Sequence, residues 1–278
     1  MAVSCDLMGG LGNQLFQIAT TLAYSWTHSI PAVFHKIHHS PSIFKPKPVY
    51  WDSYFYTLST QPTPLDDAWV YQEPRFEYDA LPKTKTDMLL RGYFQSYRYF
   101  DPYRSEILKL FQLPKSTINT IHQQYEPENW DTPIAVHIRR GDYLKLKKKH
   151  PVLSESNYYQ KALEQFPDNA NFIVFSDDIN WCKRAFKTIT TPRPYRYIRH
   201  YRDRYHQHRC FHFIESTDIN ELYLMTRCHH HIIANSSFSW WGAYMSSQTG
   251  TVVAPTLWFG KNSNRMLNDL LFDHWTKV

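Results

Sequence analysis

The chain has 278 residues, of which 42% are hydrophobic and 20% charged, and only 8 are Gly. This length fits two ordinary domains or one large one, and the composition excludes collagen-like, Gly/Ser-flexible and intrinsically disordered chains. The formal net charge of +6 favours anionic ligands or a mildly basic surface, and charge alone does not separate the two.

The four cysteines show no Cys-x-x-Cys spacing, so we expect reduced and mostly buried thiols, as in a reducing compartment. The start of the chain lacks the basic and apolar regions of a signal peptide. No apolar run reaches the roughly 18 residues of a membrane span. These features predict a cytoplasmic protein without a membrane span.

The chain begins with a predicted strand, a glycine-rich turn and a helix. An apolar run over 2–8 precedes the turn 9–14, and apolar residues then recur at helical spacing as far as Trp26. The turn is neither a GxGxxG fingerprint nor a P-loop. Gly10 and Gly12 still allow the backbone to approach a ligand closely, and Asn13 can hydrogen-bond that ligand.

The next hundred residues have weaker patterns. Residues 35–86 read as loops with short strands, between strands expected at 32–34 and 88–94. A helix is expected with Asp101 as its N-cap and Pro102 at its first position. The polar stretch 114–133 contains three prolines and is the candidate linker.

From residue 134 onward, short apolar runs alternate with helical patterns. The expected strands are 134–138, 172–175, 211–214, 231–234 and 251–254, and the expected helices are 155–166, 179–186, 218–226 and 238–246. Such alternation predicts an α/β fold with a parallel sheet covered by helices on both faces. We therefore expect two Rossmann-like domains, residues 1–130 and 131–278.

The strongest motif, His137 to Tyr143, directly follows the strand 134–138. In open α/β sheets, ligands bind beyond the carboxyl ends of the strands. Arg139 and Arg140 could form bidentate bonds to a pyrophosphate there. Asp142 could orient a guanidinium or take a proton from a substrate. The alternative is a purely structural Arg–Asp pair in a loop.

Two further motifs also follow predicted strands. Asp177 and Asp178 could bind a base, a ribose or a metal, or one of them could simply cap the next helix. Ser236 and Ser237 open a predicted helix, where hydroxyl and free N–H groups form an anion site, although ordinary capping explains them equally well. The neighbouring Trp240 and Trp241 favour packing over ligand stacking.

Two tracts resemble other kinds of site. Residues 228–231 read Cys-His-His-His, but in a strand their side chains alternate between opposite faces, which argues against a metal site. Residues 193–212 are rich in Arg, His and aromatic residues, like a nucleic-acid-binding stripe. A basic lid over an anionic donor or a solvated loop explains this tract as well, and we expect no nucleic-acid partner.

Together, these motifs resemble the inverting α-1,2-fucosyltransferases of glycosyltransferase family 11. The resemblance rests on residues 9–17, 137–143, 175–178 and 235–243, which occur in the order of the family, whereas residues 35–130 match loosely. It implies a GT-B-like fold of two facing Rossmann-like domains with mostly parallel sheets. The N-terminal domain would form the acceptor side, and the C-terminal domain would bind GDP-β-L-fucose.

The resemblance also implies roles for single residues. Arg139 would carry the pyrophosphate, and Arg140 would fix the loop or share that charge. His137 and Asp177 would contact the nucleoside end or the phosphates. Ser236 and Ser237 would complete the phosphate cradle. The turn with Gly10, Gly12 and Asn13 would reach the donor from the N-terminal domain.

The expected reaction is transfer of L-fucose to the 2-hydroxyl of a galactose or related hexose on a glycan. The leaving GDP needs positive charge, and the chain offers paired Arg residues and a Ser-rich helix start but no Asp-x-Asp. We therefore expect metal-independent single displacement without a cofactor, with Asp142 as the candidate base. Alternatives are another GDP-sugar transferase, another fucosyl linkage, a Rossmann oxidoreductase and a non-catalytic glycan-binding module. The sequence leaves oligomerisation open, a homo-oligomer included.

Overall fold

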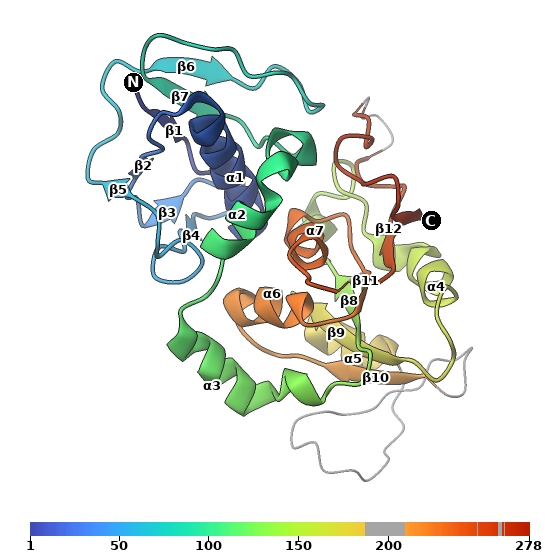
Figure 1. Ribbon diagram of the computed structural model, residues 1–278. Coiled ribbons are helices and arrows are strands. Elements are labelled where there is room, and N and C mark those ends of the chain that lie inside the picture. Colours follow the sequence, from blue (N-terminus) through green and yellow to red (C-terminus); the bar gives the residue numbers. More distant parts are fainter. Residues whose placement is uncertain (187–208, 249, 261–262, 264) are drawn as a thin grey trace. The chain divides into compact units, whose positions relative to one another are not determined.

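The computed structural model describes residues 1–186, 209–248, 250–260, 263 and 265–278 (Figure 1). Contacts group the chain into two compact units. Unit 1 contains residues 1–119 and 265–272, and unit 2 contains residues 120–264 and 273–278. The sequence-based division into 1–130 and 131–278 did not foresee that a late segment joins the first unit.

Unit 1 is built around a parallel sheet in the order β1-β7-β6. The strands are β1 (Val3–Cys5), β6 (Trp69–Gln72) and β7 (Met88–Arg91). Helix α1 (Leu11–His28) packs beside β1, with Leu15 and Phe16 fully buried. The predicted strand–turn–helix unit at the start of the chain is therefore confirmed.

The rest of unit 1 consists of short elements, as expected for residues 35–86. β2 (Phe34–His35) pairs in parallel with β5 (Thr60–Gln61), and β3 (His39–Ser40) pairs antiparallel with β4 (Lys47–Pro48).

One local prediction was wrong, and one helix was not predicted. Asp101 does not cap a helix, because Asp101–Tyr103 form a 3-10 turn and helix α2 (Arg104–Leu110) follows it. The boundary between the two units, after Asn119, lies within the candidate linker 114–133, and this stretch also contains the unpredicted helix α3 (Lys115–Tyr125). Ile118, Ile121 and Tyr125 recur at helical spacing in α3, but only Ile121 is buried, and the many polar residues of the stretch favoured a linker instead.

Unit 2 contains a six-stranded parallel sheet in the order β10-β9-β8-β11-β12-β13. The strands are β8 (Ile134–Ile138), β9 (Asn171–Ser176), β10 (Cys210–Phe213), β11 (His230–Ile232), β12 (Val252–Ala254) and β13 (Thr276–Lys277). The predicted parallel sheet is confirmed, and the terminal strand β13 adds to it.

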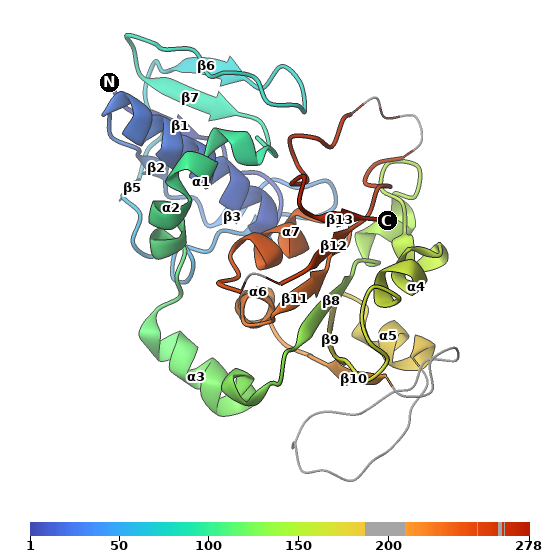
Figure 2. The same ribbon diagram turned by 45° about the vertical axis from the view of Figure 1, so that its right-hand side comes forward.

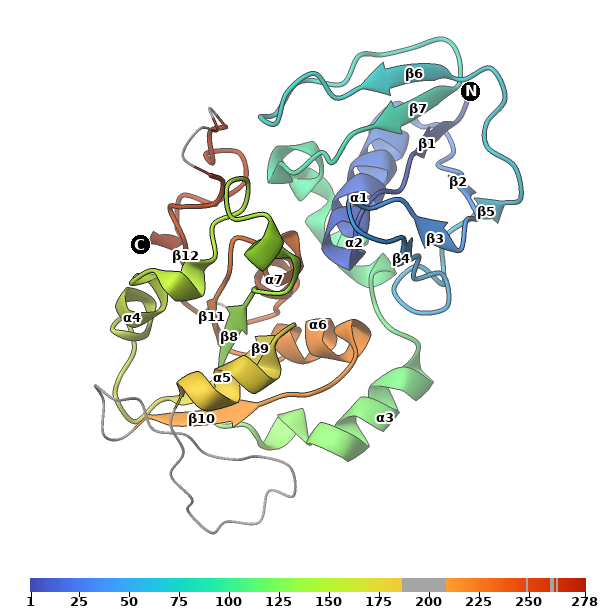
Figure 3. The same ribbon diagram turned by 180° about the vertical axis from the view of Figure 1, so that it is seen from behind.

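Helices cover both faces of this sheet, as the alternating pattern predicted. In Figure 2, α4 and α5 lie on one face and α6 and α7 on the other, and Figure 3 shows the same layers from behind. The helices are α4 (Tyr158–Leu163), α5 (Ile179–Ala185), α6 (Asp218–Thr226) and α7 (Ser237–Tyr244). The core joins buried side chains such as Val136, Val174 and Leu163.

The strand order decides where the motifs meet. β8 lies between β9 and β11, and all three run parallel. The segments that follow them therefore leave the sheet at one edge. These segments carry the Arg139–Asp142 loop, the Asp177–Asp178 pair and the Ser236–Ser237 turn, so the topology brings three predicted site motifs together.

The cysteines agree with the expectation of free thiols: Cys5, Cys182 and Cys228 are buried, Cys210 is partly exposed, and none of the four forms a disulfide. Within the part of the chain that the structure describes, no helix has the length and apolar character needed to cross a membrane.

Candidate active site

Arg139 lies at the centre of a charged cluster beyond the end of β8. Its Nη2 atom is 2.6 Å from Asp142 Oδ1, and its Nη1 atom is 3.1 Å from Asp177 Oδ2. Burial opposes its charge, but Asp177 and Asp142 outweigh that effect and raise the pKa of Arg139. The two carboxylates hold the guanidinium in place, and because the side chain is 26% exposed, the guanidinium is still accessible. Its Nε atom is buried without a hydrogen-bond partner.

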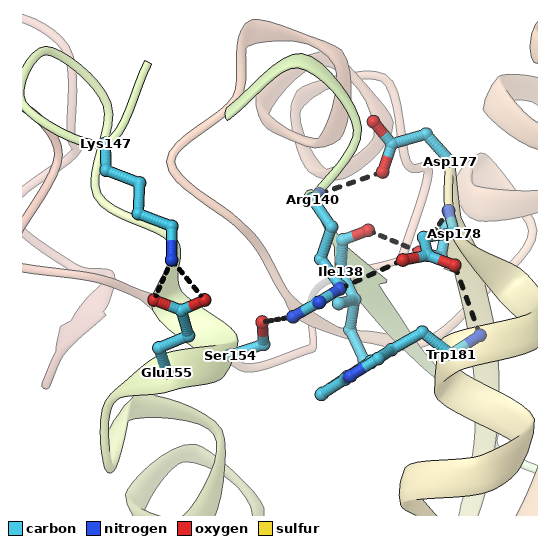
Figure 4. A network of polar contacts seen from close by, with 9 residues as sticks. Ile138, Arg140, Lys147, Ser154, Glu155, Asp177, Asp178 and Trp181 are labelled. Atoms are coloured by element: carbon cyan, nitrogen blue, oxygen red, sulfur yellow. Dashed lines mark hydrogen bonds and ion pairs between the residues drawn. The ribbon is translucent and has the colours of Figure 1, made fainter. Parts of the chain in front are cut away.

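The adjacent Arg140 has a different environment (Figure 4). Its Nε donates to Asp178 Oδ2 at 3.1 Å, its Nη1 donates to Ser154 Oγ at 2.6 Å, and its Cζ lies 3.9 Å from the centroid of the Trp181 ring. Only about a tenth of the side chain is exposed. Of the two expected roles of Arg140, these contacts fit fixing the loop.

Two carboxylates after β9 hold the arginine loop. Asp177 Oδ1 accepts the backbone N–H of Arg140 at 2.9 Å while Oδ2 faces Arg139. A Cβ at Gly141 would lie 2.3 Å from Asp177 Oδ2, so this close approach requires glycine. Asp178 accepts the N–H of Trp181 and caps α5, as the capping alternative predicted.

His137 is the last but one residue of β8, and its side chain is only 3% exposed. Burial, helped by the positive charge of Arg139, lowers its pKa to about 3, so its imidazole is neutral at physiological pH. Its Nδ1 atom is buried without a hydrogen-bond partner, and its ring lies 5.4 Å from that of Phe238. A neutral ring with an unused nitrogen can serve a ligand as a hydrogen-bond donor or acceptor but not as a charge.

The serine turn after β11 is organised by capping. Ser236 accepts the N–H of Phe238 as the N-cap of α7, and Ser237 is the first helical residue. Asn235, which sequence reasoning did not select, donates to the carbonyls of Pro151 and Trp258 at 3.0 Å each. The Asn235 carbonyl in turn accepts the Tyr143 hydroxyl at 2.8 Å, which ties the serine turn to the arginine loop.

In unit 1, the predicted turn occupies the start of α1. Gly9, rather than Gly10 or Gly12, has the left-handed conformation, with a φ of 74°. Gly10 is the N-cap, and Gly12 is buried within the helix. Asn13 accepts a hydrogen bond from Gln95 Nε2 at 2.8 Å. The turn therefore depends on Gly9, whereas the spacing in the sequence had pointed to Gly10 and Gly12.

The structure describes the tract 228–231 fully, but only the end of the basic tract 193–212. Within the described residues, no group of three His, Cys, Asp or Glu side chains is arranged to hold a metal ion. His231 is buried, and its Nε2 lies 2.9 Å from the Met225 carbonyl. The side chains of Trp240 and Trp241 are also fully buried, as the packing prediction expected. The basic tract 193–212 lies outside the described residues except for its last four positions.

Taken together, unit 2 has an accessible guanidinium held by two carboxylates, a rigid loop behind it, and the start of an eight-residue helix at the same edge of the sheet. This combination can bind and stabilise a group with several negative oxygens. Among known families, the glycosyl transferase family 11 model matches residues 2–278.

The chain belongs to glycosyl transferase family 11. It is 33% identical over 208 residues to the Escherichia coli O-antigen biosynthesis glycosyltransferase WbnK, a match that covers 70% of this chain and 62% of the relative. It is 33% identical over 175 residues to an Escherichia coli alpha-1,2-colitosyltransferase, covering 60% of this chain and 55% of that protein. A third relative, the galactoside 2-alpha-L-fucosyltransferase SEC1 of Bos taurus, is 26% identical over 269 residues and covers 88% and 65%.

This family 11 chain also has the fold of solved fucosyltransferases. The fucosyltransferase NodZ from Bradyrhizobium superposes with a TM-score of 0.53 over 87% of this chain and 92% of NodZ, at 12% identity. POFUT1, solved in complex with GDP, superposes with a TM-score of 0.51 at 14% identity, covering 90% and 95%. The predicted GT-B-like α/β fold class is thereby confirmed.

Proposed function

We propose that this family 11 protein transfers L-fucose from GDP-β-L-fucose to the 2-hydroxyl of a galactose or related hexose on a glycan. The 2-alpha-L-fucosyltransferase relative supports the sugar and the linkage, and the colitosyltransferase relative also carries alpha-1,2 in its name. The solved neighbours include NodZ soaked with GDP-fucose. The matched stretch spans 62% and 55% of the first two relatives.

The observation that carries the proposal is the Arg139 cluster. When the bond between fucose C1 and the β-phosphate oxygen breaks, the GDP oxygens gain negative charge and the sugar becomes oxocarbenium-like. A positioned guanidinium stabilises that charge at the moment it develops. Asp142 and Asp177 hold Arg139 from two sides, so it needs no reorganisation when the donor reacts. We therefore assign Arg139 to the pyrophosphate.

The other residues fit supporting roles toward the donor. Ser236 and Ser237, with the first N–H groups of α7, add hydrogen bonds to the phosphates. His137 and Asp177 contact the nucleoside end or the phosphates, and Arg140 fixes the loop. In unit 1, Gly10, Gly12 and Asn13 remain the proposed donor-contacting positions.

The acceptor 2-hydroxyl attacks C1 from the face opposite GDP, so the β-linked donor gives an α-linked product. A new C1–O bond forms as the old one breaks, and the hydroxyl proton passes to a base. Asp142 is the candidate for that base, and its 2.6 Å contact with Arg139 supports a second role, orientation of the guanidinium. In Asp142→Asn, a base role predicts a fall in kcat, whereas an orienting role predicts a loss of donor affinity first.

One reaction tests the proposal. The protein is incubated with GDP-fucose and lactose in EDTA, and product mass and GDP release are followed, with NMR assigning the linkage. A 2-linked fucosylated product supports donor, linkage and metal independence together. Activity only after Mn²⁺ or Mg²⁺ addition would overturn the metal-independent mechanism.

A second candidate is transfer of a different sugar from another GDP-sugar, which the colitosyltransferase relative favours. It is separated by offering GDP-fucose and other GDP-sugars in competition. If another GDP-sugar is turned over and GDP-fucose is not, the second candidate replaces the first.

A further inference from the structure

A partly buried carboxylate in unit 1 holds the segment that follows β7. Glu73 comes directly after β6, and its own N–H donates to the Arg91 carbonyl at 2.8 Å. Its Oε2 accepts the N–H of Tyr93 at 2.7 Å, and its Oε1 accepts the N–H of Phe94 at 3.0 Å. Burial raises the pKa of Glu73, although these two N–H groups partly offset the rise. The carboxylate thus acts as a clamp on two successive backbone amides.

The clamped turn has an unfavourable backbone conformation. Phe94 is fully buried and has a φ of 50°, in the left-handed region that bulky residues rarely adopt. A Cβ at Gly92 would lie 2.3 Å from the Glu73 Cβ, so the Glu73 side chain packs directly against the glycine backbone. Gln17 Nε2 donates to the Gly92 carbonyl at 3.1 Å from the other side. Such a conformation persists only where its surroundings impose it, and it often marks a functional position.

The turn leads directly to a neighbour of Asn13, which is one of the proposed donor-contacting residues. Gln95 Nε2 donates to Asn13 Oδ1 at 2.8 Å. Gln17, which holds Gly92, also accepts the Met8 N–H at 3.0 Å, so one side chain joins the ends of β1 and β7. Asn13 is therefore oriented by a neighbour whose position depends on the Glu73 clamp.

We infer that Glu73 is a positioning residue for Asn13. Its carboxylate fixes the turn 92–94, the turn fixes Gln95, and Gln95 sets the orientation of the Asn13 amide. The functional consequence rests on the donor-contacting role proposed for Asn13. Glu73 acts through other residues and has no chemical part in the transfer.

The test is a double-mutant cycle in the full chain between Glu73→Gln and Gln95→Ala. A carboxamide keeps one acceptor oxygen but presents N–H donors to the other amide, so one clamp bond is lost. We expect about a tenfold fall in kcat/KM for GDP-fucose, mainly through KM, with the acceptor KM nearly unchanged. Because Glu73 acts through Gln95, the double variant should be no worse than Gln95→Ala alone.

Glu77→Gln is the matched control. Glu77 also accepts a backbone N–H, that of Met266 at 2.8 Å, and among the described residues it makes no contact with Gln95. In the double variant of Glu77→Gln and Gln95→Ala, the fold-losses in kcat/KM of the two single variants should therefore multiply. The inference is overturned if the fold-losses in kcat/KM of Glu73→Gln and Gln95→Ala also multiply in the double variant. It is likewise overturned if the KM values for donor and acceptor rise together in proportion to a fall in melting temperature.

A measurement without substrate separates this inference from the proposed function. In Glu73→Gln, the Phe94 amide should exchange its hydrogen faster and the Asn13 side-chain amide resonances should shift, with neither change in Glu77→Gln. If these changes appear but GDP-fucose is not turned over by the unmodified chain, only the proposed function fails. Unchanged Asn13 resonances would refute the positioning role whatever the activity.

Discussion

The charge balance around Arg139 allows a quantitative prediction for Arg139→Ala. The guanidinium lies 2.6 Å from Asp142 and 3.1 Å from Asp177, which are themselves 32% and 25% exposed. Removing it takes the cluster of one cation and two anions from a net charge of −1 to −2. A diphosphate would then approach two carboxylates without their guanidinium partner instead of a cation.

The expected loss follows from electrostatics. Two unit charges 4 Å apart interact by about 4 kcal/mol at an effective dielectric constant of 20. About 1.4 kcal/mol corresponds to a factor of ten in rate, so kcat/KM should fall by about 10³. Steady-state kinetics with GDP-fucose and lactose measure this loss, and thermal unfolding shows whether the variant is folded.

A double variant decides what the loss means. Arg139→Ala with Asp142→Asn restores the charge of the cluster without restoring a donor-binding guanidinium. We expect it to regain stability and to remain inactive. If it recovers to within about tenfold of the unmodified chain, Arg139 only neutralises Asp142 and its assignment to the pyrophosphate is refuted. Arg140→Lys is the comparison. Loss of the stacking on Trp181 and of the forked hydrogen bonds should lower the melting temperature clearly, whereas kcat/KM should fall much less than in Arg139→Ala.

Two further predictions concern close packing and pH. Gly141→Ala places a methyl group 2.3 Å from the present position of Asp177 Oδ2, so Asp177 must move. We expect a 10- to 100-fold fall in kcat/KM (about 1.4–2.8 kcal/mol). Unchanged kinetics would show that Asp177 does not position Arg139. Burial lowers the pKa of His231 to about 4, so between pH 6.5 and 4 the unfolded chain binds a proton that the folded chain does not. Stability should therefore fall as the pH drops through this window, by up to about 1.4 kcal/mol per pH unit, and urea unfolding of His231→Gln should show a shallower slope. Identical slopes would mean that His231 titrates normally.

Much of unit 2 was predictable because its sheet is buried on both faces. Apolar runs such as 134–138 and 172–175 stand out between helical patterns, and the parallel order then places the following motifs at one edge. Helix α3 was missed because the polar residues and three prolines of the stretch 114–133 favoured a linker, although Ile118, Ile121 and Tyr125 do recur at helical spacing. Strand β13 was missed because a two-residue pairing has no sequence period to detect.

Single residues were harder to predict where long-range contacts decide their roles. Glu73 and Gln95 lie in a stretch whose match to the family is loose, and the backbone conformation of Phe94 that connects them has no local sequence signal. Gln14 and Gln17 did carry a signal, since both are polar positions within an apolar helix. Both side chains are fully buried and hydrogen-bonded, Gln14 to the Gly9 carbonyl and Gln17 to the Gly92 carbonyl.

The paired arginines show why a motif can need both residues when one of them meets the ligand. Arg140 is nearly buried, and Asp178, Ser154 and the Trp181 ring leave its guanidinium no freedom. Its backbone N–H also binds Asp177, the same carboxylate that holds Arg139. Loss of the Arg140 side-chain contacts would free the loop that carries this N–H and so loosen one of the two anchors of Arg139. Because electrostatic stabilisation of a leaving group depends on charges that are already in place, the rigid second arginine contributes to the chemistry by keeping the first one fixed.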